Sequence, residues 1–523
     1  MTGSKPTNWR RSLRGLSLLA GTVLLGGCVV GPDFTPPPVP DVKLTPKPLK
    51  APGAAGGESQ RFVNGRDIPG EWWTLFRSKS LNAVVERALA DNHDIAAAQA
   101  ALRIAHANVE AQRGAFFPTI DASHNSTRAK VATGDVSSPV NSPSPYYTLH
   151  TAQLSMSYAP DVFGGLRRQV ESLKAQKELQ RFQLEATFLT LTTNIASAAV
   201  QEASLRDQIR ATRHIIGIQK ELLALLKKQL ELGQIAELDV ATQEAALAQS
   251  EQTLPPLQKQ LAINRDLITA LSGHFAGEGL AESFEFAQMR LPAKLPVSLP
   301  SEIIARRPDI RAAEANVHAA SAQIGVAIAN RLPQFSIMGN AGRQASQFSN
   351  LFNFAPAYGF WTIAGTATQV VFDGFTLEQK QRAAEAGFDQ AIEQYRSTVI
   401  LAFQNVADAL QALEHDTRGL KAAKASEMAS AKSLRLIRQQ LELGQVSSLQ
   451  VLNAQQTYLQ ALLAVAQAKA NRYSDTIALF QALGGGWWNR EDVAPIPDEH
   501  GWLTRLFRRG YDKADTEKTN PRG

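Results

Sequence analysis

The hexapeptide QLELGQ occurs twice in this chain, at Gln229–Gln234 and at Gln440–Gln445. This recurrence constrains the fold more than any other feature of the sequence, because it is part of a longer duplication. Three further pairs of segments align in the same order: 94–118 with 309–333, 162–165 with 371–374, and 270–273 with 482–485. The chain therefore repeats one module of about 210 residues, which is too long for the unit of about 20–50 residues of a solenoid.

The N-terminal segment has the layout of a bacterial secretory signal. Four basic residues precede the apolar run Leu16–Leu25, and the small residues Gly26 and Gly27 lead to Cys28. Cys28 is the only cysteine of the chain, so no intramolecular disulfide can form. The pattern LGGC resembles the lipobox of bacterial lipoproteins, whose cysteine carries the lipid, whereas a buried free thiol would stand here only by coincidence. Val29 replaces the Asp of an inner-membrane retention signal, which favours the outer membrane.

The charge balance argues against a nucleic-acid partner. Residues 1–27 hold four of the 54 Lys and Arg side chains and none of the 48 Asp and Glu side chains, so their removal lowers the formal net charge from +6 to +2. Without a basic stripe interleaved with aromatic residues, the electrostatic footprint of nucleic-acid binding is missing. The expected organisation is a signal peptide at 1–27, a lipid-anchored Pro- and Gly-rich linker at 28–70, modules at 71–290 and 291–486, and a charged, disordered tail at 487–523.

Each module contains one exceptionally long helical pattern. Glycine and proline are nearly absent from 165–232 and 374–443. Each run predicts a helix of about 65 residues, or about 100 Å. Gly233 and Gly444 follow at the points where a helix would end and the chain reverse. The two QLELGQ copies are therefore predicted to form the tips of two α-helical hairpins.

The shorter helical patterns constrain how the long helices pack. The return helices at 238–271 and 449–483 reach only half of their long partners. Further helical patterns at 81–113 and 300–331 supply the missing length. We expect each long helix to be paired by two short ones stacked end to end, which gives a tall, narrow body. Within the last run, Arg306 to Asp309 indicates a helix entry.

Between the short and long runs of each module, the pattern changes to period two. Residues 146–158 alternate mainly apolar and mainly polar side chains with tyrosine at both ends. This pattern suits a membrane β-strand, and a small soluble hairpin is the alternative. The other expected strands are 119–130, 334–344 and 358–373. Four strands cannot close a barrel, so membrane-spanning strands require several chains, and three chains would supply about twelve.

The chain resembles a known family, the TolC-like outer-membrane efflux factors, and within this family the NodT-type lipoproteins. The match covers nearly the whole mature chain, and the residues that carry it are Cys28, Gly31–Phe34, Trp72, Trp73, Phe76, Leu81, Tyr158, Asp161–Gly164, Leu299–Ser301, Arg306–Ile310, Ala313, Glu314, Ile324–Ala327 and Pro333. The resemblance implies a mainly α fold with a small β part. Three chains would form a twelve-stranded outer-membrane β-barrel and a periplasmic α-barrel.

The resemblance also implies partners and site residues. Such a homotrimer is the exit duct of a tripartite pump, joined through a periplasmic adaptor to an inner-membrane efflux pump. The predicted adaptor contacts are the hairpin tips, although simple helix-turn chemistry also accounts for these residues: Leu232, Gly233, Gln234, Leu443, Gly444 and Gln445. Asp239 matches an acidic position that narrows the family's entrance, whereas Gln450 and Asn453 stand where relatives can carry aspartates. A trimer would then present three carboxylates there, which argues against strong cation binding.

Two other classes of function compete with a channel. An enzyme would need a nucleophile with a base, paired carboxylates in a cleft or a metal cluster, but the nine histidines are scattered without metal-ligand spacing. Neither GxSxG nor a P-loop occurs, so we expect no catalysis and no cofactor beyond the lipid on Cys28. The stronger rival is a lipid-anchored periplasmic coiled-coil scaffold without a pore.

Overall fold

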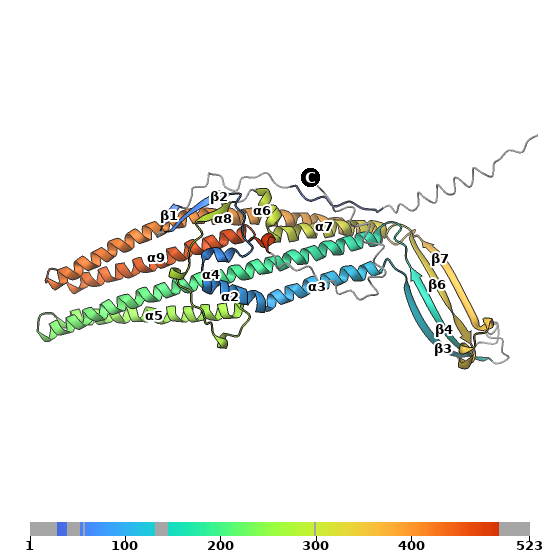
Figure 1. Ribbon diagram of the computed structural model, residues 1–523, viewed down its shortest axis with the longest axis horizontal. Coiled ribbons are helices and arrows are strands. Elements are labelled where there is room, and N and C mark those ends of the chain that lie inside the picture. The colour runs from blue at the N-terminus through green and yellow to red at the C-terminus, as the bar shows by residue number, and fades with distance from the viewer. Residues whose placement is uncertain (1–28, 39–52, 56–57, 131–144, 298–299, 491–523) are drawn as a thin grey trace, which may run out of the picture.

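A computed structural model describes residues 29–38, 53–55, 58–130, 145–297 and 300–490. The described chain forms a long, narrow body of helices with a four-stranded sheet at one end (Figure 1). Cys28 lies outside the described residues. The predicted class, mainly α with a small β part built from a duplicated module, is confirmed.

Two helices of 67 residues run the length of the body, α4 (Gly165–Glu231) and α8 (Thr376–Glu442). Their sequences explain this length, because Pro is absent and Gly is rare between their ends. The chain then reverses into α5 (Glu237–Leu271) and α9 (Ser448–Ala482), each of 35 residues. Both hairpins were predicted within a few residues.

The shorter helices cover the remaining length of the long ones. Helices α3 (His93–Gly114) and α5 follow one another along α4, and α7 (Pro308–Ala329) and α9 follow one another along α8 (Figure 1). Helix α4 also packs against α7 and α9, so the two modules share one interface. The predicted end-to-end pairing is confirmed. No helix among the described residues is long and apolar enough to cross a membrane.

The predicted run 81–113 is two helices rather than one. Helix α2 (Lys79–Asp91) ends at Asn92, and α3 begins immediately afterwards. The Asn92 side chain accepts hydrogen bonds from the backbone N–H groups of Asp94 (2.8 Å) and Ile95 (3.2 Å). It also donates to the backbone oxygen of Leu271 at the end of α5 (3.0 Å). A single asparagine therefore caps one helix and fixes the bend to a neighbouring hairpin.

The run 300–331 breaks in the same way, into α6 (Pro300–Arg306) and α7. Pro308 occupies the first turn of α7 and Asp309 lies in that turn, as the helix-entry interpretation predicted. The Arg307 guanidinium bonds to Asp309 (2.7 Å) and to the backbone oxygen of Ala482 in α9 (2.9 Å). This arginine thus ties the start of α7 to the end of the second hairpin.

The four-stranded sheet is antiparallel, with the order β3-β4-β6-β7. Its strands are β3 (Thr119–Lys130), β4 (Tyr146–Tyr158), β6 (Gln334–Ala345) and β7 (Gly359–Thr368). Directly opposed residues of neighbouring strands lie on the same face of the sheet, so the strand register shows which side chains share each face. One face, the apolar face, includes Ile120, Leu154, Ile337, Trp361 and Ile363. The other, the polar face, includes Asp121, Asn125, Gln153, Asn340 and Thr362.

A second small sheet corrects the extent of the predicted linker. Strands β1 (Gly53–Ala55) and β2 (Glu58–Asn64) lie within the predicted linker 28–70, and β2 pairs in parallel with β5 (Lys294–Val297). Gln60 of β2 is buried and accepts a hydrogen bond from the Arg472 guanidinium (3.0 Å). This buried polar pair holds β2 against the helical body.

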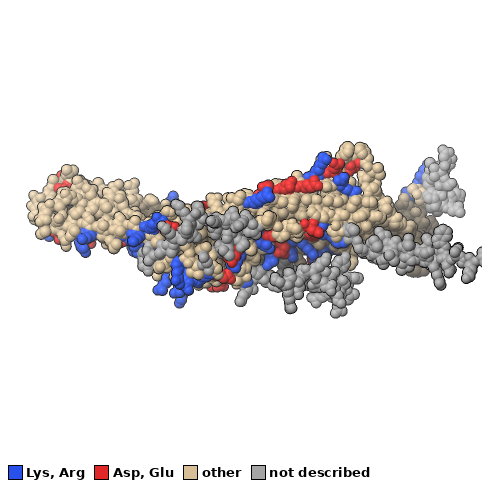
Figure 2. Space-filling view, turned by 90° about the horizontal axis from the view of Figure 1, so that it is seen from above, with Lys and Arg blue, Asp and Glu red and all other residues tan. Residues whose placement is uncertain are grey.

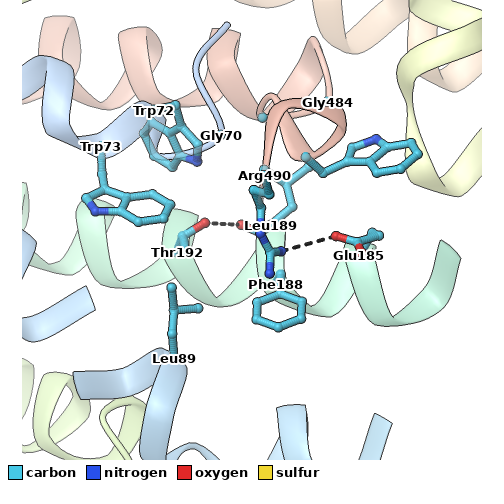
Figure 3. Close-up of a pocket in the computed structure, with 12 residues that line it drawn as sticks. Gly70, Trp72, Trp73, Leu89, Glu185, Phe188, Leu189, Thr192, Gly484 and Arg490 are labelled. Carbon is cyan, nitrogen blue, oxygen red and sulfur yellow. Dashed lines mark hydrogen bonds and ion pairs between the residues drawn. The ribbon is translucent and has the colours of Figure 1, made fainter. Parts of the chain in front are cut away.

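The described start of the predicted tail also belongs to the body. Arg490 inserts beside α4, with its guanidinium carbon 3.8 Å from the centre of the Phe188 ring (Figure 3). It forms an ion pair with Glu185 at 3.1 Å, and both side chains are almost fully buried. A disordered tail from residue 487 was therefore wrong for 487–490, while residues 491–523 lie outside the described residues. Nearby, Trp72 is buried and stacks on Phe480 at 5.6 Å, so it anchors this part of the chain to the helical body.

Candidate functional site: hairpin tips and anchor segment

The two QLELGQ copies form the tips of the α4–α5 and α8–α9 hairpins. Both tips lie at the same end of the body, and the four-stranded sheet lies at the opposite end (Figure 1). On the face drawn in Figure 2, charged side chains gather over the middle of the body and are few toward the tips. The second tip and the following helix contribute to this, because residues 443–468 contain no charged side chain. The duplicated motif thus builds a paired terminal surface.

Each tip ends its long helix with the same glycine-dependent turn. Gly233 and Gly444 both have a φ of 70°, a conformation that other residues adopt only with strain. The next residue, Gln234, donates its backbone N–H to the Gln229 oxygen (2.9 Å), and Gln445 donates to Gln440 at the same distance. Together with the glycine N–H bonds, these form a Schellman motif that satisfies the last helical carbonyls.

The predicted adaptor contacts are all on the surface of the described chain. Leu232 is 64% exposed and Leu443 is 72% exposed, and the glycine and glutamine that follow each leucine are exposed as well. An apolar cluster that includes Val240 and Val451 supports the tips from below. Apolar side chains held outward by a rigid turn form a surface suited to contact with another protein.

Asp239, the predicted acidic entrance residue, connects the two hairpins. It lies in the first turn of α5, where the helix dipole favours a negative charge. Its carboxylate accepts a hydrogen bond of 2.7 Å from the Ser448 hydroxyl at the start of α9. Ser448 was not predicted as a site residue, and its only signal in the sequence is its place at the start of the return helix of the second module. The acidic residue is thus part of a contact between modules, and not an isolated surface charge.

The other two predicted entrance residues lie beside a groove between α8 and α9. Gln450 and Asn453 are exposed and line this groove, whose volume is about 320 Å³. The remaining lining residues are Ser430, Ser433, Ile437, Ala454 and Thr457. No charged side chain lines it, so the groove offers hydroxyl and amide groups and no carboxylate. Among the described residues, no group of three His, Cys, Asp or Glu side chains could hold a metal ion.

Buried amide side chains that were not predicted from the sequence weaken the packing between the helices near the tips. Gln455 in α9 is fully buried, and neither its Nε2 nor its Oε1 has a hydrogen-bond partner. The buried Oε1 of Gln219 in α4 also has none. Each unsatisfied buried polar group costs about 1–3 kcal/mol. These helices are therefore held together less strongly than an apolar seam would hold them.

The segment that follows Cys28 is fixed at the other end of the body. The Val30 N–H donates to the backbone oxygen of Phe163 (3.1 Å). Gly31 has a φ of 92°, and a Cβ there would lie 2.4 Å from the Cα of Gly325, so only glycine fits. We call residues 29–34 the anchor segment. The anchor segment lies beside the junction of β4 and α4, next to the four-stranded sheet.

A buried arginine holds the anchor segment. Arg168 is 3% exposed, and it donates to the backbone oxygens of Val30 (3.0 Å) and Gly31 (3.1 Å) and to the carboxylates of Asp33 (2.9 Å) and Glu171 (2.8 Å). Burial lowers the pKa of the guanidinium, but the hydrogen bonds to Glu171 and Asp33 more than compensate and raise it. Arg168 therefore keeps its positive charge although it is buried.

These features define a class of protein. A long helical body with two exposed tips, joined to a sheet that has one polar face, one apolar face and two unpaired edge strands, is the protomer of a membrane channel. The sheet edges need partners in lipid, and the polar face suits a water-filled lumen.

Comparisons with known proteins agree with this class. The family model described as "Outer membrane efflux protein" matches residues 84–274 and again 299–485, one match in each module. The chain is 29% identical to the pyoverdine export outer membrane protein OpmQ of Pseudomonas putida over 446 residues, which cover 85% of this chain and 94% of that protein. It is 27% identical to nodulation protein T of Rhizobium leguminosarum bv. trifolii, over 89% of this chain and 96% of that protein.

Solved structures share the fold. The outer-membrane channel OprN superposes with a TM-score of 0.78 at 27% identity, covering 88% of this chain and all of that chain. The CmeC outer membrane channel of Campylobacter jejuni gives 0.79 at 22% identity, over 89% of this chain and 96% of that chain.

The chain therefore belongs to the outer membrane efflux protein family. The predicted efflux channel at the outer membrane is confirmed, and no relative supports the scaffold without a pore. The family consists of channel proteins and not of enzymes.

Proposed function

We propose that three copies of this chain form one continuous duct, with a twelve-stranded β-barrel in the outer membrane and a helical barrel in the periplasm. The observation that carries this proposal is the sheet order, which leaves β3 and β7 as edges without a partner strand among the described residues. Unpaired backbone groups are not tolerated in lipid, so β7 of one copy must pair with β3 of the next. Closure by three copies then satisfies both edges of each sheet.

The duct conducts small solutes passively and needs no cofactor beyond a covalent lipid on Cys28. The polar face of the sheet lines the lumen, and the apolar face contacts lipid. The anchor segment supports lipidation of Cys28, because it holds the neighbouring residue Val29 beside the sheet. The lipid and the barrel can then enter the same membrane.

At the periplasmic end, the hairpin tips contact an adaptor that joins the duct to an inner-membrane efflux pump. Leu232, Gly233 and Gln234 on one hairpin, with their counterparts on the other, offer the exposed surface for this contact. Asp239, Gln450 and Asn453 surround the entrance, and the bond between Asp239 and Ser448 holds the two hairpins together there. Separation of the hairpins at this bond widens the entrance.

Single-channel recording and electron microscopy test the duct. The detergent-extracted protein should appear as three-fold tubes well over 100 Å long, since each long helix alone spans about 100 Å. The same preparation should produce discrete conductance steps in planar bilayers. Compact monomers, or solid rods that conduct no ions, would refute the proposal.

A pair of variants tests the tip contact. Leu443→Asp places a charge on an exposed tip leucine, whereas Ile263→Asp places the same charge on α5 at a residue that is 58% exposed. Only the tip variant should lose co-purification with the adaptor and export in cells, and it should retain conductance in bilayers. Equal loss from both variants would show that the tips have no special role.

A further inference from the structure

The charges of the four-stranded sheet are unevenly distributed. Its strands contain three Lys or Arg residues, Arg128, Lys130 and Arg343, and one acidic residue, Asp121. Lys130 pairs with Tyr146 and Arg343 pairs with Ala152, which lie on the same side of β4 as the apolar residues. The register therefore places all three cations on the apolar face and the one acid on the polar face. We call the three cations the cationic belt.

The cationic belt lies at the end of the sheet farthest from the helices. Arg128 and Lys130 are at the end of β3, and Arg343 is near the end of β6. Along β3, Ile120 and Arg128 are about 27 Å apart at about 3.4 Å per residue. With a strand tilt of about 40°, this corresponds to about 20 Å across the membrane, near the far edge of an apolar band of about 25 Å. The belt thus lies where lipid chains end and head groups begin.

Aromatic side chains accompany these cations and keep them at the surface of the apolar face. The Lys130 ammonium lies 5.7 Å from the centre of the Tyr146 ring, and the Arg343 guanidinium lies 4.8 Å from that of Phe354. Tyr146 is 55% exposed and Phe354 is 85% exposed. Aromatic rings at this height are typical of the membrane interface, where they contact both chains and head groups.

The charges of the belt lack anionic partners in the described chain. None of the ion pairs among the described residues includes Arg128, Lys130 or Arg343, and the buried Nε of Arg343 has no hydrogen-bond acceptor. Residues 346–358, which connect β6 to β7, contain no charged side chain. Asp135, in the connection from β3 to β4, lies outside the described residues. The three cations on the apolar surface therefore have no carboxylate partner among the described residues and can bind an anion from the surroundings.

We propose that the cationic belt binds the phosphate groups of lipids in the outer leaflet. The proposal rests on the proposed function, because the apolar face must contact lipid. Lys or Arg on this face is destabilising at the membrane midplane but tolerated at the interface. Arginine recognises phosphate with paired N–H donors, and each cation near an anionic membrane surface strengthens binding. The lipid phosphates neutralise the belt, while the acyl chains cover the apolar face below it.

The test measures binding of bisphosphorylated lipid A and of its fully dephosphorylated form to the detergent-extracted trimer by native mass spectrometry. The wild type should bind the phosphorylated form at least tenfold more tightly. The triple variant Arg128→Gln, Lys130→Gln, Arg343→Gln should weaken that binding on the order of 100-fold. Because loss of the partly buried Arg343 could disturb folding, the double variant Arg128→Gln, Lys130→Gln is measured as well. Both of its residues are exposed, and it should also bind the phosphorylated lipid more weakly than the wild type.

A matched control removes three exposed cations from the helical body, Arg213, Lys259 and Lys421, and should leave lipid binding unchanged. The belt faces away from the lumen, so the triple variant should keep the wild-type conductance. Equal binding of the two lipids by the wild type, unchanged binding by the belt variants, or saturation of the site by inorganic phosphate alone would overturn the proposal. A wild type that forms no pores would instead refute the proposed function.

Discussion

Asp475 in α9 and Asp416 in α8 form a pair of carboxyl groups between the helices of the second hairpin, and this pair predicts a pH-dependent stability. Burial, the hydrogen bond to Asp416 and the charge of Asp416 together raise the pKa of Asp475 from 3.8 to about 7, and burial contributes most. The buried Oδ2 of Asp416 has no hydrogen-bond partner among the described residues. A proton on Asp475 allows one hydrogen bond between the two carboxyl groups and removes the repulsion between two negative charges.

The sign of the pH dependence follows from which state binds the proton. The folded pKa of Asp475 lies above the unfolded value, so the folded state holds more protons between them, and stability falls as pH rises from about 4 to about 7. The shift of about three pH units corresponds to at most about 4 kcal/mol, at about 1.4 kcal/mol per unit. Because the pair is partly solvent-accessible, we expect about half of this, or about 2 kcal/mol.

The substitution Asp475→Asn should remove this cost. Hydrogen exchange of the α8–α9 segments around the pair should slow about 30-fold at pH 8, which corresponds to about 2 kcal/mol. The difference from the wild type should shrink as the pH falls toward 4. The control Asp389→Asn removes an exposed carboxylate from α8 and should change little at either pH. A difference of equal size at pH 5 and pH 8, or faster exchange in Asp475→Asn at pH 8, would refute this reasoning.

Five further substitutions test other parts of the molecule. Gly233→Ala should destabilise the first hairpin by about 1 kcal/mol, because alanine is strained at the left-handed φ of this residue. Gly217→Ala inside α4 should instead stabilise the hairpin by about 0.5–1 kcal/mol. Thermal unfolding should therefore show a lower melting temperature for the first variant and a higher one for the second. Arg168→Met should cost about 3 kcal/mol and release the anchor segment, which limited proteolysis detects. Gln455→Met should raise the stability of the hairpin packing by about 1–3 kcal/mol, measured by chemical denaturation. Ser448→Ala removes a hydrogen bond to a carboxylate, worth about 1.5–3 kcal/mol, and should raise the fraction of time that single channels are open.

Local patterns predicted the elements of this fold well. The long helices and their tips follow from helix-forming composition that ends at Gly233 and Gly444, and turn chemistry depends on only a few neighbouring residues. The strands follow from alternation that reaches over a single segment. Features that depend on distant partners were missed. The bond between Gln60 and Arg472 joins residues 412 positions apart, so nothing near residue 60 indicates that the predicted linker returns to the body.

In the candidate site too, local features were predictable from the sequence and contacts between distant residues were not. The exposed tip residues were predictable because both copies of the motif end a helix and turn in the same way. The contact between Asp239 and Ser448 was not, since it joins residues 209 positions apart on two different hairpins. The sequence shows only that the acidic residue of the first module is replaced by Gln450 in the second.

The duplication also explains why the two tips can differ in chemistry while sharing one backbone. The Schellman turn requires glycine and helical carbonyls, and both copies retain these features. It places no demand on the residues that follow, so Asp239 in one copy and Gln450 in the other occupy equivalent positions at no conformational cost. The carboxylate of Asp239 accepts a hydrogen bond from Ser448 of the opposite hairpin, so the acidic residue of the first copy adds one contact between the hairpins. Two carboxylates at this contact would repel one another, whereas the Ser448 hydroxyl donates a hydrogen bond to the Asp239 carboxylate.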